Sequence, residues 1–133
     1  MIHAARETQQ FHGLIIDSSF GSLDRMASKI IEGQAIIPGF FRKLAKDMAL
    51  FFAQSDLGFN LQQYSPEHAV RLLNLPILFI HGKGDPLIPW TETQQLYVNA
   101  REPKQLVFFN TEGHYGTLFD PNYLEIIRKF LQR

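Results

Sequence analysis

The sequence predicts an α/β fold with a parallel sheet of three strands and flanking helices. Short, continuously apolar runs at 13–17, 76–81 and 105–109 are typical of strands that are covered on both faces. Segments with helical periodicity separate these runs, and such alternation favours right-handed crossovers and a parallel sheet. A chain of 133 residues suits one domain, so we expect a single domain over 1–133.

The segment before the second strand is expected to be mainly helical. Residues 2–10 have the composition of a helix tail, and Ser22 is a suitable cap for a helix that runs to about Glu32. Ser65-Pro66-Glu67 is a strong start for a short helix over 66–73. Between them, one apolar face recurs at helical spacing and comprises Phe41, Leu44, Ala45, Met48, Phe51 and Phe52. Its aromatic residues, with Phe40, could line an acyl pocket, but core packing is the favoured interpretation.

The remaining elements alternate in the same way. A helix is predicted over 90–100, and loops are predicted at 82–86 and 111–116, after the second and third strands. Asp120-Pro121 is predicted to begin the last helix, by a cap followed by proline. The apolar stripe of that helix is Tyr123, Ile126, Ile127, Phe130 and Leu131.

Composition excludes several classes of function. Lysine plus arginine balance aspartate plus glutamate at 13 each, so no basic face is forced and nucleic acid is not expected as a partner. Cysteine is absent, which excludes disulfides, thiolate catalysis and thiolate metal ligands. No apolar run is long enough to span a bilayer, and the first ten residues are too polar for a signal peptide. We therefore expect a cytoplasmic protein that does not enter a membrane.

Two polar residues stand out after the predicted strands. Asp85 follows the second strand and His114 follows the third. In open α/β sheets the chemistry lies at the carboxyl ends of the strands, where these loops emerge. Each residue also has a simpler interpretation, because Gly84-Asp85-Pro86 is good turn chemistry and His114 could be an ordinary loop histidine.

The stretch 75–89, Leu-Pro-Ile-Leu-Phe-Ile-His-Gly-Lys-Gly-Asp-Pro-Leu-Ile-Pro, resembles the acid-bearing strand of α/β-hydrolase serine hydrolases. Gly113-His114-Tyr115 resembles the histidine loop of that family, and the order acid then histidine matches it. Residues 14–20 resemble the strand after the nucleophile helix, and 65–73 the helix before the acid strand. The branch most similar to the chain contains peptidases and esterases related to prolyl oligopeptidase. The resemblance implies that Asp85 is the acid and His114 the base of a catalytic triad.

The sequence departs from the family at the nucleophile. The family carries its serine in Gly-x-Ser-x-Gly, and no such pentapeptide occurs among the 133 residues. The resemblance implies that the chain is the C-terminal half of the fold, supplying the last three strands, with the nucleophile and part of the oxyanion hole before Met1. Ser18, Ser19 and Ser22 are interpreted as loop and cap residues, in a turn without strain or an adjacent anion hole.

No cofactor and no metal ion are expected. Gly82-x-Gly84 is not a dinucleotide fingerprint, because Leu87 stands where a third glycine is needed and prolines delay the next helix. No histidine or acid pair has metal-ligand spacing on a helix. His81 is predicted to be a packing or hydrogen-bonding residue of its strand. The remaining histidines, His3, His12 and His68, are predicted to lie on the surface.

The resemblance implies hydrolysis of an ester, amide or thioester of a small acyl substrate by a Ser-His-Asp triad. The 133 residues alone are predicted to be inactive, for want of the nucleophile. Two alternatives remain: a non-enzymatic remnant that folds as an oligomer, and a small-ligand binding module. Because the 14–17 strand would lack its neighbour, we expect either a separate N-terminal half as partner or a homodimer. The alternative is that residues 1–10 cover this edge.

Overall fold

The computed structural model describes residues 2, 11–33, 38–57 and 65–132. Contacts divide the chain into two compact units, residues 1–21 with 66–133, and residues 22–65. Apart from Ile2, the predicted N-terminal helix tail lies outside the described residues.

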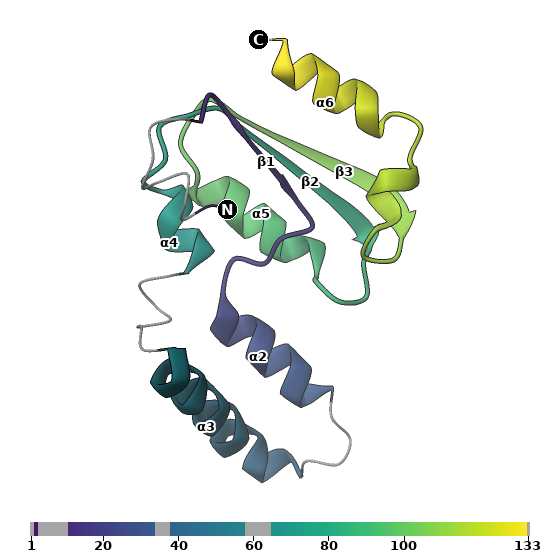
Figure 1. The fold of residues 1–133 in the computed structure, drawn as a ribbon. Coiled ribbons are helices and arrows are strands. Elements are labelled where there is room, and N and C mark those ends of the chain that lie inside the picture. Colours follow the sequence, from purple (N-terminus) through teal and green to yellow (C-terminus); the bar gives the residue numbers. More distant parts are fainter. Residues whose placement is uncertain (1, 3–10, 34–37, 58–64, 133) are drawn as a thin grey trace. The chain divides into compact units, whose positions relative to one another are not determined.

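The first unit contains the predicted parallel sheet. Its strands are β1 (Leu14–Asp17), β2 (Ile77–Gly84) and β3 (Lys104–Glu112), in the order β1-β2-β3 (Figure 1). Both pairings are parallel, with Leu14 opposite Ile77 and Ile77 opposite Lys104. The predicted fold class is therefore confirmed, with β2 at the centre of the sheet.

Two strands are longer than predicted, because residues expected in the following loops still pair. β2 continues to Gly84 and β3 to Glu112, and these two residues face each other beyond a register shift between Gly82 and Gly84. Glycine is needed at this irregularity, since a Cβ at Gly82 would lie 2.7 Å from Thr111 Oγ1. The extension carries the ends of β2 and β3 directly to the two loops of interest.

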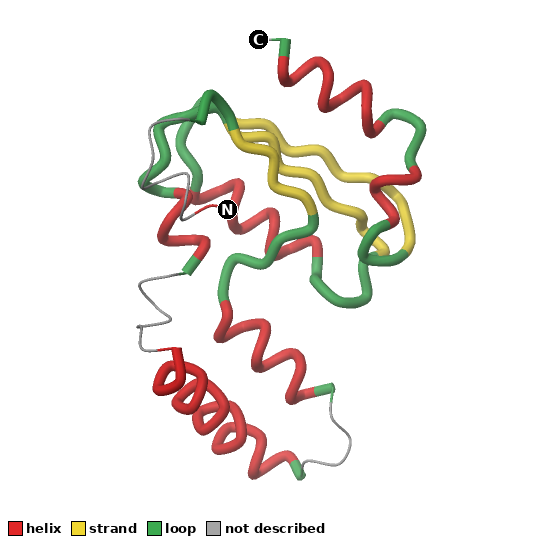
Figure 2. Tube along the Cα trace, viewed as in Figure 1, coloured by secondary structure: helices red, strands yellow, loops and turns green. Residues whose placement is uncertain are grey.

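Helices cover both faces of this sheet (Figure 2). On one face, α4 (Pro66–Val70) and α5 (Trp90–Asn99) pack on alternate strand residues such as Ile77 and Phe79. On the other face, α6 (Tyr123–Leu131) packs on Leu78 and Ile80 through Phe130. Coverage of both faces explains why β2 is apolar without alternation, as in other buried parallel strands.

The boundaries of two predicted helices, the 66–73 helix and the last one, differ from the structure. The predicted 66–73 helix ends at Val70 and continues as a turn. The last helix begins at Tyr123 and not at Pro121, because the Asp120 side chain accepts a hydrogen bond from the Asn122 N–H and holds a turn. A short 3₁₀ helix, η1 (Gly116–Phe119), precedes this turn and was not predicted.

The second unit is a helix pair, α2 (Leu23–Glu32) packed against α3 (Gly39–Leu57). Ser22 caps α2 as predicted, its Oγ accepting from the Arg25 N–H at 3.3 Å. The prediction that the apolar face of α3 forms core was wrong. Its large side chains are about half to four-fifths exposed: Phe40, Phe41, Leu44, Met48, Phe51 and Phe52. No residue of α2 is buried, and Ala45 and Leu50 of α3 are only partly buried. No helix in the described ranges has the length and apolarity to cross a membrane.

Candidate active site

Asp85 is fixed by the turn that follows β2. Its Oδ1 accepts hydrogen bonds from the backbone N–H groups of Leu87 at 2.8 Å and Ile88 at 3.0 Å. This is the local chemistry by which aspartate initiates turns. The carboxylate is completely buried, and Oδ2 is left for another partner. The turn interpretation of Asp85 is therefore correct, and the turn holds the second oxygen in a defined place.

That partner is His114. The loop after β3 turns at Gly113, whose φ of 83° is in the left-handed region that favours glycine, and its N–H bonds to the Gly84 carbonyl. His114 Nδ1 lies 2.7 Å from Asp85 Oδ2, and the His114 side chain is 24% exposed. A carboxylate only accepts, so Nδ1 carries the proton, and in the neutral ring Nε2 has the free lone pair. The two residues singled out from the sequence are thus brought into contact.

The surroundings keep Asp85 ionised. Burial opposes its ionisation, but the hydrogen bonds from His114 and from the Ile88 and Leu87 N–H groups together outweigh burial, so the pKa of Asp85 is lower than usual. A charged acceptor beside Nδ1 favours the tautomer of His114 in which Nδ1 carries the proton. The pair is therefore an oriented imidazole bonded to an ionised carboxylate.

Behind Asp85 lies His81, buried and hydrogen-bonded as predicted. Its Nε2 is 3.0 Å from the Ile88 carbonyl and 3.6 Å from Asp85 Oδ2. Its Nδ1 is 2.6 Å from Thr93 Oγ1, which is 3.0 Å from the Ser19 carbonyl. Burial lowers the pKa of His81, although the Ile88 carbonyl and Asp85 act to raise it, so the neutral ring is favoured.

The loop that carries His114 is held by Asp17, a residue that sequence analysis did not select. Asp17 Oδ2 accepts from Thr117 Oγ1 and from the Tyr123 hydroxyl, each at 2.9 Å. Burial, with help from the Asp17 carboxylate, raises the pKa of Tyr123 to about 12. The signal was present, because Asp17 ends an apolar strand, but its partners lie about a hundred positions later.

The turn after β1 corrects another expectation. Ser18 has a φ of 47°, which is strained for a residue with a side chain. The prediction that this turn is free of strain was therefore wrong. Its hydroxyl donates to Asp17 Oδ1 at 2.9 Å. Ser22 is the helix cap described above, and Ser19 Oγ is at most a weak donor, 3.5 Å from the Phe20 carbonyl. All three serines have the loop or cap roles that were predicted.

Four apolar side chains on the two loops are exposed: Leu87, Tyr115, Leu118 and Phe119. We refer to these four as the apolar rim. Leu87 belongs to the loop that carries Asp85, which we call the acid loop, and the other three lie between His114 and the end of η1. Apolar surface beside a polar pair is common at sites that bind small molecules. Among the described residues no three metal-ligating side chains gather, here or elsewhere.

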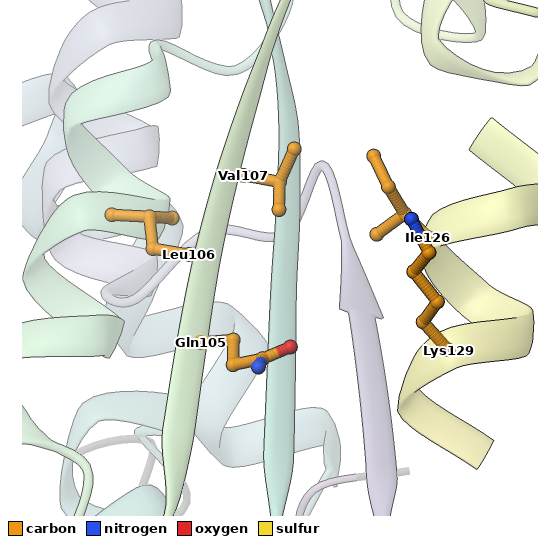
Figure 3. Close-up of a pocket in the computed structure, with 5 residues that line it drawn as sticks. All are labelled: Gln105, Leu106, Val107, Ile126 and Lys129. Atoms are coloured by element: carbon orange, nitrogen blue, oxygen red, sulfur yellow. The ribbon is translucent and has the colours of Figure 1, made fainter. Parts of the chain in front are cut away.

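A cavity of about 420 Å³ lies between β3 and α6, lined by Gln105, Leu106, Val107, Ile126 and Lys129 (Figure 3). Val107 and Ile126 face each other across it, whereas Leu106 points to the opposite face of the sheet. The β3 residues of this cavity pair with 78–80, near the start of β2, whereas the candidate pair follows the ends of β2 and β3. The cavity is therefore separate from Asp85 and His114.

The three-layer architecture and the similarity to solved structures define part of an α/β-hydrolase fold. An esterase from Pyrococcus furiosus, Pf2001, superposes with a TM-score of 0.66 at 20% identity, covering 99% of this chain and 48% of the esterase. An acylaminoacyl peptidase from Pyrococcus horikoshii superposes with a TM-score of 0.64 at 14% identity, covering 99% of this chain and 21% of the peptidase. At these identities the similarity establishes the fold alone.

Sequence comparison finds relatives whose own roles are uncharacterised. The protein YfhR of Salmonella typhimurium is 29% identical over 123 residues, which is 90% of this chain and 35% of YfhR. The chain thus spans about a third of the length of the curated relatives it matches. No family model matches the chain.

Proposed function

We propose that the chain supplies the acid and the base of a Ser-His-Asp hydrolase that cleaves esters, amides or thioesters. Asp85 is the acid and His114 the base. The observation that carries the proposal is the 2.7 Å hydrogen bond from His114 Nδ1 to a fully buried Asp85. Among the described residues only Nδ1 of this ring is hydrogen-bonded, which leaves Nε2 for a nucleophile.

The chemistry follows from this geometry. A serine hydroxyl donates its proton to His114 Nε2 as its oxygen attacks the acyl carbonyl and forms a tetrahedral intermediate. The resulting imidazolium is stabilised by the Asp85 carboxylate, which keeps its charge because its pKa is lowered. Nε2 then returns the proton to the leaving alcohol, amine or thiol. Water next attacks the acyl group on the serine in the same way, and the carboxylic acid product is released. Asp85 remains ionised throughout.

The serine is proposed to come from outside the 133 residues. No Gly-x-Ser-x-Gly occurs in them, and Ser18 is committed to Asp17. Solved structures of the same fold extend well beyond the part that this chain covers. In the esterase, the chain covers 48% of the length. An in-frame Gly-x-Ser-x-Gly in the coding sequence before Met1 would support the proposal.

Activity provides the direct test. The 133-residue chain should hydrolyse a chromogenic short-chain ester no faster than buffer and should take no fluorophosphonate label. A chain extended to include the serine should do both, and Asp85→Asn in it should lower kcat on the order of 10⁴-fold, since the histidine loses its tautomer. Full activity of an extended His114→Ala protein would refute the proposal, and so would activity of the 133-residue chain that His114→Ala abolishes.

The open edge of β1 favours assembly, either with that N-terminal segment or with a second copy. β1 pairs with β2 along one edge, and no described strand pairs with its other edge. Its side chains are those of an interior strand, with Leu14 and Ile16 buried. An unpaired apolar edge of this kind is a template for another strand. In a homodimer, a two-fold axis would place the two β1 edges side by side.

Sedimentation across a dilution series tests this assembly. We expect a species larger than 15.3 kDa at micromolar concentration, with the mass falling on dilution. The Ile15 side chain is partly buried, and its backbone N–H lies at the open edge, since the Leu14 and Ser18 N–H groups bond on the β2 side. Ile15→Pro should therefore block a new pairing, because proline lacks this N–H donor. A monodisperse 15.3 kDa protein with cooperative thermal unfolding would refute assembly without bearing on Asp85 and His114.

A further inference from the structure

His81 joins three segments that meet behind the acid. The residue lies in β2, four positions before Asp85, and its side chain is completely buried. Nε2 contacts the Ile88 carbonyl at the end of the acid turn, and Nδ1 contacts Thr93 on α5. Thr93 in turn contacts the Ser19 carbonyl in the loop after β1. A residue needed only to fill this space would be apolar, because burying an imidazole costs free energy unless its nitrogens are satisfied.

Hydrogen-bond accounting fixes the tautomer of His81. The Ile88 carbonyl can only accept, so Nε2 must carry a proton. In the neutral ring that burial favours, Nδ1 must then accept, and the Thr93 hydroxyl is the donor at 2.6 Å. The Thr93 hydroxyl also lies 3.0 Å from the Ser19 carbonyl, which is a second acceptor for its one proton. The ring is therefore held by one donated and one accepted bond, with its N–H directed at the acid turn.

The position of that N–H matters for Asp85. Ile88 both donates its N–H to Asp85 Oδ1 and receives the Nε2 proton of His81 on its carbonyl. The same Nε2 lies 3.6 Å from Asp85 Oδ2, the oxygen that accepts the proton of His114. One N–H thus secures the turn that binds Oδ1 and places a positive dipole beside Oδ2.

We propose that His81 is a positioning residue for the acid, acting through its Nε2–H to hold the Ile88 carbonyl and so keep Asp85 Oδ2 aligned with His114. This inference rests on the proposed function, because it assigns His81 a role in the Asp85–His114 pair. It also explains why a buried strand contains a histidine directly after the apolar residues Phe79 and Ile80. Thr93 is part of the device, since its hydroxyl fixes the other nitrogen.

A matched pair of substitutions separates the Nε2 role from packing. In His81→Gln the side-chain amide nitrogen reaches the place of Nε2 and can still donate to Ile88, whereas in His81→Asn the amide reaches only the place of Nδ1. Both replace a buried ring by a buried amide. The readout is the strongly deshielded proton NMR resonance of His114 Nδ1–H in its bond to Asp85, measured on the 133-residue chain and assigned by its loss in Asp85→Asn.

We expect the resonance to be retained in His81→Gln and lost in His81→Asn, and likewise retained in Thr93→Ser and weakened in Thr93→Val. Val70→Ala, a truncation of a fully buried residue in α4, is the control that lowers stability without touching the turn. It should keep the resonance.

Each outcome is decisive. A resonance that survives in His81→Asn, or that is lost equally in His81→Gln and Val70→Ala, overturns the positioning role alone. A wild-type spectrum without the resonance overturns the proposed function and with it this inference. Should His81→Asn fail to fold, Thr93→Val and Thr93→Ser still decide, because the same ring loses or keeps the hydroxyl that orients it.

Discussion

The loop that carries the acid and the loop that carries the histidine are held in different ways. Asp85 is completely buried, and its turn is closed by N–H groups two and three residues later. His114 is partly exposed, and its loop is held at Thr117 by Asp17, a hundred residues earlier. Asp85, the proposed acid, is thus a rigid support made locally, and His114, the proposed base, is presented on a loop that depends on a distant clamp.

This difference suits the two proposed roles. An orienting acid has to keep one oxygen fixed, and it gains from burial among donors. A base has to reach a nucleophile and substrate, so its outer nitrogen needs access. The acid loop therefore depends on His81 behind it, and the histidine loop depends on Asp17 and Gly113.

Removing the distant clamp should have the largest effect. Asp17→Ala leaves the hydroxyls of Thr117 and Tyr123 without their acceptor, and each unsatisfied buried group costs about 1–3 kcal/mol. We expect a loss of about 2–4 kcal/mol in the free energy of unfolding. Chemical denaturation monitored by circular dichroism measures it.

Glu125→Ala is the control for this prediction. It removes an exposed carboxylate paired with Arg128, near the start of the same α6 that Asp17 holds through Tyr123. Pairs on the surface contribute little, so this variant should unfold almost as the wild type does. Equal losses in the two variants would show that the Asp17 clamp does not form.

The turn of the histidine loop gives the next effect. Gly113→Ala meets no neighbouring atom, so its only penalty is the φ of 83°, about 1–2 kcal/mol for a residue with a Cβ. Gly39→Ala is the matched control, because it also meets no atom but lies in α3, where alanine favours the helix. Thermal melts of the two variants should move in opposite directions. A neutral Gly113→Ala would mean that the loop does not turn at this residue.

The acid loop can be probed by pH. His81 has a lowered pKa in the folded chain, so between that value and 6.5 the unfolded chain binds more protons. Stability is therefore complete above pH 6.5 and declines below it as His81 is forced to charge. The groups that act on this titration are Asp85, Asp17 and His114. His81→Gln should flatten the profile in this window, as measured by unfolding at a series of pH values. An unchanged slope would contradict a neutral buried His81.

Sequence reasoning selected Asp85 and His114, which the structure brings into contact, because their signals are local. Continuous apolarity predicted the covered strands, and the polar residues after the second and third strands indicated Asp85 and His114. Asp17 escaped because its partners lie in η1 and α6, and no periodicity encodes a contact a hundred residues away. The exposed face of α3 was misjudged for a related reason: helical spacing predicts an apolar stripe but not what covers it.

The smallest effect is expected on the apolar rim, to which each loop contributes at least one exposed large side chain. Leu87 is 60% exposed on the acid loop and Phe119 is 85% exposed near the end of the histidine loop. Surface substitutions of this kind change stability by no more than about 0.5 kcal/mol. Leu87→Ser and Phe119→Ser should therefore melt close to the wild type at every protein concentration. A larger loss that grows with protein concentration would mean that a second copy covers the rim, since truncation then removes apolar area from an interface. Because Leu87 and Phe119 lie on different loops, a loss confined to one variant would also identify which loop makes that contact.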